Sequence, residues 1–222
     1  MLKKYAALLS DYSIDAQAGQ RVLIKSSYLA EPLLQELYTH LLQKGCFVEF
    51  DLSFNDQDRL FYDHSSDTQL TTPSVFYEKA IEEFDAMIRI IAPFNLKSTA
   101  GVPSAIKQLH QEAMAPLRKR YMQRSATKDL KWVLCVYPTL AAAQECGMSL
   151  GEYEQFVYSS CMLDQDDPNK AWQDLSKRQQ ALVDYLNKGS EVRYVGDKTD
   201  ITFSTKGRIW INSDGHYNMP SG

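Results

Sequence analysis

Two kinds of hydrophobic pattern alternate along this chain: helical spacing of apolar residues and short continuous apolar runs. At its start, Leu2, Tyr5, Leu9 and Tyr12 follow spacings of three and four residues, which predict an amphipathic helix. Short apolar runs then recur farther along the chain, and each of them is bounded by charged or turn-forming residues. They lie at residues 21–25, 46–52, 86–92 and 132–137. Because helical segments separate these four predicted strands, we expect an α/β fold with a mostly parallel sheet and helices on both faces.

The segment between the first two predicted strands has the features of a crossover helix. Pro32 suits its first turn, Leu37 lies in the middle of a wide apolar stripe, and Gly45 ends it. A strand, a helix and a strand of these lengths form a right-handed βαβ unit.

Further helices are expected on either side of the third and fourth strands. Residues 55–70 are polar and only weakly helical, and a helix is expected to open at Pro73. Pro103 starts a long helix that Pro116 is expected to kink or split. Three more helical pieces are expected, at about 140–146, 150–161 and 168–188.

The pattern changes near residue 190. Short alternating runs at 191–195, 200–204 and 208–211 predict an antiparallel meander. We therefore expect an N-terminal α/β domain at residues 1–189, followed at 190–222 by the first antiparallel strands of a second, β-rich domain that is truncated. A meander cut there would leave residues 209–211 under-covered, as an edge able to pair with another chain.

Composition narrows the class of protein. The 222 residues are 44% hydrophobic, carry a net charge of −4 and include four cysteines. The charge gives no reason to expect nucleic acid or a membrane as partner, and no apolar run approaches the ~20 residues of a membrane span. The cysteines lack metal-site spacing, so we expect them to be reduced and the protein to be cytoplasmic. A basic cluster at 118–128 is interpreted as a solvated helix face, with a phosphate site as the alternative.

One motif could belong to a serine hydrolase. Residues 147–151 match G-x-S-x-G, and Asp184, Asp200 and His216 follow Ser149 in the order that a catalytic triad needs. The nucleophile elbow requires a strand running directly into the serine, however, and the preceding residues are helical. The favoured interpretation is a capping box, with Ser149 and Glu152 at the start of a helix.

The remaining motifs are weak. Residues 164–169 resemble the opening of a calcium loop, but Asn169 occupies the glycine position, and a carboxylate-rich helix N-terminus explains them without metal. The first strand–helix junction, at residues 26–30, contains no glycine, which argues against a dinucleotide fold. The four histidines show no zinc spacing, although His216 could line a substrate cleft.

Several short segments, in order and in spacing, resemble the two-metal aminopeptidases that include aminopeptidase T and aminopeptidase S. In that family an N-x-P-x-G run is followed directly by a glutamate that binds metal, and the last residues of this chain match the run. The matching segments are Ala-Gly-Gln-Arg-Val-Leu-Ile at 18–24, Tyr-Pro-Thr at 137–139, Asp-Asp-Pro at 166–168 with Trp172, Asp-Ile-Thr-Phe at 200–203, and Asn218, Pro220 and Gly222.

The resemblance implies a cytoplasmic metalloexopeptidase that removes N-terminal residues from peptides and is a homodimer when full length. It implies two divalent ions, zinc or cobalt, which hold a bridging hydroxide and polarise the scissile carbonyl. The family's ligands lie beyond residue 222, so no catalytic, cofactor-binding or metal-binding residue is assigned in this chain. We expect the chain to be inactive alone. The alternatives are a non-catalytic binding or interaction domain and, less favoured, a serine hydrolase using Ser149.

Overall fold

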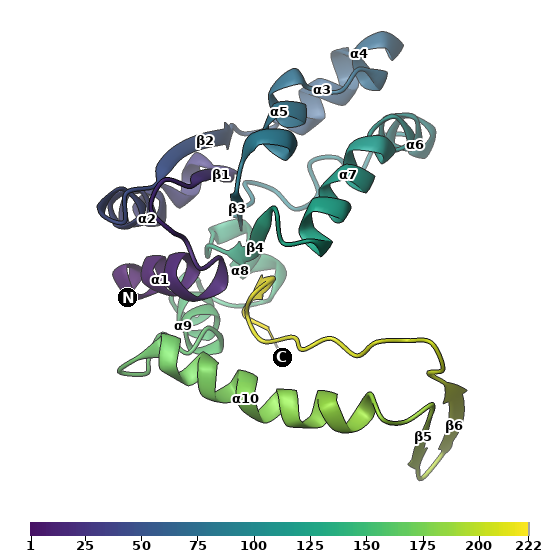
Figure 1. The fold of residues 1–222 in the computed structure, drawn as a ribbon. Coiled ribbons are helices and arrows are strands. Elements are labelled where there is room, and N and C mark those ends of the chain that lie inside the picture. Colours follow the sequence, from purple (N-terminus) through teal and green to yellow (C-terminus); the bar gives the residue numbers. More distant parts are fainter. Residues whose placement is uncertain (222) are drawn as a thin grey trace.

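A five-stranded parallel sheet forms the centre of the molecule (Figure 1). The computed structural model describes residues 1–221. The strand order is β2-β1-β3-β4-β7, and every neighbouring pair is parallel. The strands are β1 (Arg21–Ser27), β2 (Phe47–Ser53), β3 (Ala86–Ile91), β4 (Lys131–Val136) and β7 (Asn218–Met219). The predicted α/β class and mostly parallel sheet are therefore confirmed.

The larger half of the core lies on one face of this sheet. Successive strand residues point to opposite faces, so Val22 and Ile24 of β1 share this face with Ile88 of β3. It is covered by α1 (Leu2–Ala7), the π-helical turn Leu8–Ser13 that continues it, and α2 (Glu31–Gln43). This packing confirms the predicted opening helix and crossover helix.

A smaller core lies on the other face. Leu23 of β1 and Met87 of β3 pack there with Phe84. The helices α5 (Val75–Glu83) and α7 (Ala115–Ala126) cover this face, and contribute Ala80, Tyr77 and Tyr121 to the cluster. The sheet is thus enclosed on both faces, as parallel sheets require.

The other helices follow the predicted order. Pro116 divides the long helix into α6 and α7, with Met114 between them, because its ring prevents the backbone from continuing as one helix. The remaining elements are the 3-10 turn Tyr28–Ala30, α3 (Gln57–His64), α4 (Asp67–Thr71), α6 (Ser104–Ala113), α8 (Leu140–Glu145), α9 (Leu150–Ser160) and α10 (Pro168–Leu186). In the part of the chain that is described, no helix is both long and apolar enough to cross a membrane.

The basic cluster at 118–128 has structural partners. Arg120 pairs with Glu82, and Arg124 donates to the carbonyl oxygens of Ile81 and Phe84. These contacts tie α7 to the end of α5 and to the turn before β3. They favour the interpretation of the cluster as a helix face over a phosphate site.

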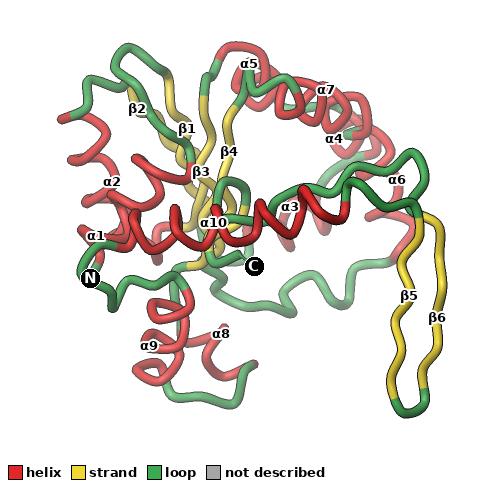
Figure 2. Tube along the Cα trace, turned by 60° about the horizontal axis from the view of Figure 1, so that its bottom comes forward, coloured by secondary structure: helices red, strands yellow, loops and turns green. Residues whose placement is uncertain are grey.

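Two of the three predicted meander strands are present, and the third prediction was wrong. The strands β5 (Glu191–Gly196) and β6 (Thr199–Ser204) form an antiparallel hairpin that projects away from the body (Figure 2). Residues 208–213 do not join it. They run back beside α10, where the Trp210 backbone amide donates to the Asn187 side chain and Asn212 donates to the Ser176 carbonyl oxygen. The Trp210 amide, which a strand could have offered to β6, is therefore bonded to the Asn187 side chain at the end of α10.

Candidate functional site at the carboxyl edge of the sheet

The order of the strands places a crevice between the ends of β1 and β3. The chain leaves β1 toward β2 on one side and then crosses to β3 on the other side. At such a switch point the connections after the two strands diverge, and ligands of open α/β sheets bind there. The loop after β3, at residues 94–101, lies at this edge and contributes Phe94, Asn95 and Ser98 to the lining of the crevice.

Serine hydroxyls hold the strand ends together at this point. Backbone pairing of β1 with β3 extends to Lys25 and Arg89. Beyond that pair, Ser26 Oγ donates to the Ile90 carbonyl oxygen at 3.2 Å and Ser27 Oγ donates to that of Ala92 at 2.6 Å. The hydroxyls replace the missing backbone bonds, so the floor of the crevice is fixed.

A row of charged side chains crosses the sheet at the same level. Asp51 of β2, Lys25 of β1 and Arg89 of β3 are register partners on adjacent strands. Lys25 and Asp51 form an ion pair. Arg89 is an exposed position of β3, and within residues 1–221 its side chain makes no hydrogen bond or ion pair. The face that buries Leu23 and Met87 thus becomes charged one side-chain row later.

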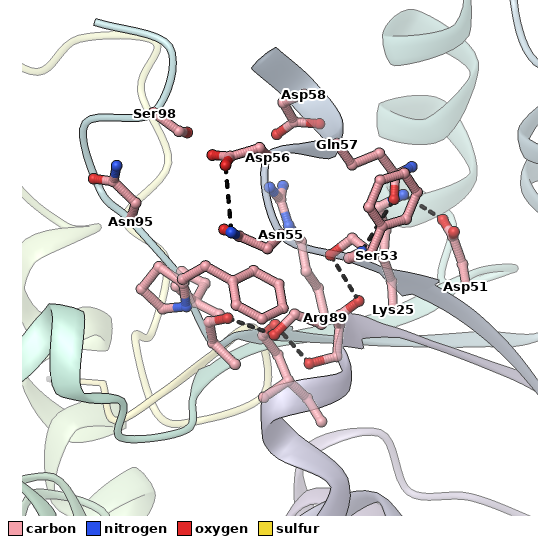
Figure 3. Close-up of a pocket in the computed structure, with 18 residues that line it drawn as sticks. Lys25, Asp51, Ser53, Asn55, Asp56, Gln57, Asp58, Arg89, Asn95 and Ser98 are labelled. Carbon is pink, nitrogen blue, oxygen red and sulfur yellow. Dashed lines mark hydrogen bonds and ion pairs between the residues drawn. The ribbon is translucent and has the colours of Figure 1, made fainter. Parts of the chain in front are cut away.

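These residues line a cavity of about 310 Å³ (Figure 3). Arg89 rises from the sheet toward the segment between β2 and α3, which carries Asn55 and Asp56. Asp56 and Asp58, at the start of α3, also line the cavity. Sequence inspection missed this site because the signal is the register of Lys25 with Arg89, and register is not visible along one strand.

The segment that resembles the approach to the family's first metal ligand ends at this edge as well. Asn218 and Met219 of β7 pair with Leu134 and Cys135 of β4, and β7 runs parallel to its neighbour. The residues after Met219 therefore emerge at the carboxyl edge of the sheet.

Before β7, a buried carboxylate anchors this segment. Asp214 accepts from Ser176 Oγ at 2.6 Å and is 2.8 Å from His216 Nδ1, and Tyr12 donates to the Asp214 carbonyl oxygen at 2.7 Å. Burial acts to raise the pKa of Asp214, but the bonds from Ser176 and His216 outweigh it and hold the pKa below its usual value. Gly215 follows at φ +93°, where an added Cβ would lie 2.8 Å from the Met219 side chain.

His216 lines a second cavity, of about 490 Å³, at the other end of the strands. Trp132 and Tyr217 form an aromatic wall there, with ring centroids 5.3 Å apart. The cavity lies beside the first residues of β4 and therefore at the amino edge, away from the crevice between β1 and β3.

The residues of the possible serine triad lie in unrelated places. Ser149 caps α9 in a reciprocal box with Glu152. Asp200 pairs with Arg193 in the hairpin, and His216 is bonded to Asp214. The capping-box interpretation is confirmed, and the triad has no geometry to support it. Asp167 likewise caps α10, where its side chain accepts from the Lys170 amide.

Residues 1–221 do not fit a two-metal centre. They contain no group of three or more His, Cys, Asp or Glu side chains close enough to hold a metal ion. The histidines are also separated: His40 bonds Asp11, His110 bonds the Leu70 carbonyl oxygen, and His216 bonds Asp214. Any metal step would need ligands that these residues do not supply.

Comparison with known proteins gives the family. The model of the thermophilic metalloprotease family (M29) matches residues 1–222. The chain belongs to this thermophilic metalloprotease family. It is 24% identical to Aminopeptidase 2 of Geobacillus stearothermophilus over 230 residues, covering 94% of this chain and 54% of that protein. The structure of wild-type AmpT from Thermus thermophilus superposes with a TM-score of 0.75 at 18% identity, covering 99% of this chain and 59% of that one.

Membership in M29 confirms the resemblance found in the sequence. The chain spans about half the length of the curated relative that it matches. The AmpT comparison shows that the α/β fold described here is shared despite low sequence identity.

Proposed function

We propose that this chain is the N-terminal α/β part of a two-metal aminopeptidase, with residues 190–222 leading into a second, catalytic, β-rich domain. The observation that carries the proposal is the position of β7. Its two residues pair with β4 and direct Pro220 and Ser221 to the carboxyl edge of the sheet. The resemblance places a metal-binding glutamate directly after this run.

The role of the described residues is to position this segment. Tyr12 and Ser176 hold Asp214 from two different helices, and the small Gly215 lets Met219 reach the core, where it is 1% exposed. In the whole enzyme, two divalent ions such as zinc or cobalt would supply the activated hydroxide. This chain supplies a fixed approach to that centre and one wall of the substrate space.

Three finer points belong to the same proposal. The substrates are peptides cut at their N-terminal residue, the enzyme works in the cytoplasm, and the full-length protein is a homodimer. The family match supports the first point, and the other two are what the resemblance to this family implies. By itself the 222-residue chain is inactive.

The test is an assay with the purified 222-residue chain and with a chain extended by the codons that follow in the gene. We expect hydrolysis of leucine p-nitroanilide, with zinc or cobalt present, by the extended chain alone. Calorimetric titration of the shorter chain with either metal should reveal no tight paired sites. Peptide trimming by the shorter chain, free of any longer form, would end the proposal. A longer chain without clustered Glu, His and Asp would favour the binding-domain alternative.

A further inference from the structure

Along one side of the parallel sheet, β2 forms a long edge without a partner strand. It is the last strand in the order β2-β1-β3-β4-β7, and within residues 1–221 no strand pairs with its outer side (Figure 1). The edge at the other end of the sheet is formed by β7, which has only two residues. Free backbone groups on an edge strand can pair with a strand of another chain. In this sheet, the β2 edge alone is long enough to do so.

The register identifies the free backbone groups. The Phe47 amide donates to the Gln20 carbonyl oxygen, and β2 then follows β1 residue by residue over its whole length. Successive residues of a strand direct their backbone groups to opposite sides. Alternate residues from Phe47 onward therefore bond β1, and the amides and carbonyl oxygens of Val48, Phe50 and Leu52 point outward.

The edge has none of the usual obstacles to strand addition. The seven residues of β2 include no proline and no lysine, and their register with β1 is continuous, without a bulge. Phe47, Glu49, Phe50 and Leu52 are exposed. The β2 edge is thus both regular and open to solvent.

Apolar side chains border the free groups on one face of the sheet. Val48, Phe50 and Leu52 alternate to the face covered by α2, and the last two are 37% and 45% exposed. Tyr38 of α2 packs on Phe50 with ring centroids 5.5 Å apart, and Leu42 follows it one turn later. Both of these α2 residues are also exposed. An added strand with apolar residues on this face would remove all of this surface from water.

The other face of the edge is acidic. Glu49 is exposed and forms no ion pair within residues 1–221, and Asp51 on the same face is paired with Lys25. A second copy of this chain does not suit such an edge. The antiparallel register that pairs all seven residues of two β2 strands would place each Glu49 opposite an Asp51, and like charges directly opposite each other are destabilising. A basic side chain opposite Glu49 would be stabilising instead.

From these features we infer that β2 binds an extended peptide segment, which adds to the five-stranded sheet as a further strand. The segment carries apolar side chains at alternate positions, packed beside Tyr38 and Phe50, and a lysine or arginine between them, opposite Glu49. The inference does not rest on the proposed function, because no residue that positions β7 takes part in it.

The probe is a synthetic heptapeptide, acetyl-Thr-Val-Lys-Val-Lys-Val-Thr-amide, added to the isotope-labelled 222-residue chain at low chain concentration. Its alternation is symmetric, so a lysine reaches Glu49 in either strand direction. At saturating peptide, we expect amide hydrogen exchange of Val48, Phe50 and Leu52 to slow by about tenfold or more, because the new strand accepts from these amides. Exchange at residues 49 and 51 should not change, since their amides already bond β1.

Two outcomes of this experiment would overturn the inference. One is unchanged exchange at Val48, Phe50 and Leu52 with the peptide at millimolar concentration. The other is protection of these amides that appears without peptide and grows with the concentration of the chain, because it would assign the edge to a second copy.

Two matched peptides separate the charge from the backbone bonds. Glutamate in place of both lysines should weaken binding by about tenfold or more, since attraction to Glu49 becomes repulsion. An N-methyl group on the central valine should have an effect of about the same size, because it removes an amide donor and blocks close pairing. Equal affinity of all three peptides, measured by fluorescence anisotropy, would contradict strand addition.

A charge reversal on β2 tests the position of the basic residue. In Glu49→Lys we expect the lysine peptide to bind about tenfold more weakly and the glutamate peptide to bind more tightly than before. A folding defect could not produce this exchange of preference. The matched control is Glu191→Lys, which changes an exposed glutamate at the start of β5, in the other sheet, and should leave the preference unaltered.

An unchanged preference in Glu49→Lys would contradict the assignment of this residue. Urea midpoints verify that both variants fold. If Glu49→Lys does not fold, the lysine and glutamate peptides still test the charge on the unmodified chain.

Discussion

At the scale of single residues, polar side chains in this chain mainly form hydrogen bonds with free backbone groups at helix ends or with other polar side chains. Ser149 is the clearest case, because its motif suggested a nucleophile and its hydroxyl is instead engaged with Glu152. Asp214 is another, because it joins its own segment to two helices that are remote in sequence, through Tyr12 and Ser176.

Replacing Ser149 with alanine removes the cap of α9. We expect the free energy of unfolding to fall by about 0.5–2 kcal/mol, whereas Ser149→Gly should lower it by only a few tenths of about 1 kcal/mol. Urea denaturation followed by circular dichroism measures both. A fluorophosphonate probe should leave Ser149 unlabelled, and stoichiometric labelling there would revive the hydrolase alternative.

The Asp214 carboxylate should make stability depend on pH. Its pKa is lowered in the folded chain, so its contribution is complete above the unfolded value of about 3.9 and is lost as the pH falls through the folded value. We expect Asp214→Asn to be less stable by about 1.5–3 kcal/mol at neutral pH. Urea midpoints measured from about pH 7 downward should converge below the folded pKa. A constant gap throughout would rule out this linkage.

At the scale of elements, α2 owes its position to one buried stripe. Leu33, Leu37 and Leu41 are fully buried against the sheet, while Leu42 is 46% exposed on the same helix. The helix also carries Pro32 in its first turn, which favours its start.

Leu37→Ala should therefore lower the free energy of unfolding by roughly 2–5 kcal/mol, since it leaves a cavity in the larger core. Leu42→Ala, the control, should change it by no more than about 0.5 kcal/mol. Chemical denaturation gives both values. A wild-type urea midpoint for Leu37→Ala would contradict the placement of this helix.

The elements that sequence could predict are those whose signal is local. The apolar runs of β1, β3 and β4 and the proline at 116 are such signals, and each prediction agrees with the structure to within two residues. The alternation at 208–211 misled because Trp210 is half-buried while Ile209 and Ile211 face solvent, which mimics a strand pattern. The two residues of β7 are too few to show a period at all.

For the candidate site, the sequence can predict the location but not the side chains that form it. A loop after a strand in an α/β pattern predicts a ligand edge, and the loop after β3 lies there. The chemistry could not be predicted, because Lys25, Asp51 and Arg89 become neighbours only when three strands align in register.

At the scale of the whole molecule, the hairpin and the arm that follows it are sparsely packed. Every residue of β6 is exposed, and Ile209 and Ile211 are 83% and 75% exposed. An isolated two-stranded hairpin is marginally stable, so this region is the natural place for contact with other surfaces.

We expect the 222-residue chain to self-associate at high concentration through this region. Ile209→Ser with Ile211→Ser should reduce the sedimentation-detected dimer, because it removes apolar surface from the arm. The control is Val75→Ser with Leu140→Ser, which changes two similarly exposed residues at helix starts elsewhere. A chain that stays monomeric at every accessible concentration would contradict this prediction.

The pairing of β4 with β7 has a consequence for synthesis on the ribosome. Roughly 80 residues separate these two neighbours, and at about 5–20 residues per second they take about 4–16 s to translate. During that interval the backbone groups on one side of β4 have emerged without their partner. The nascent chain therefore spends seconds with β4 as an unpaired edge strand. This makes it a natural client for cotranslational chaperones until residue 219 has been synthesised.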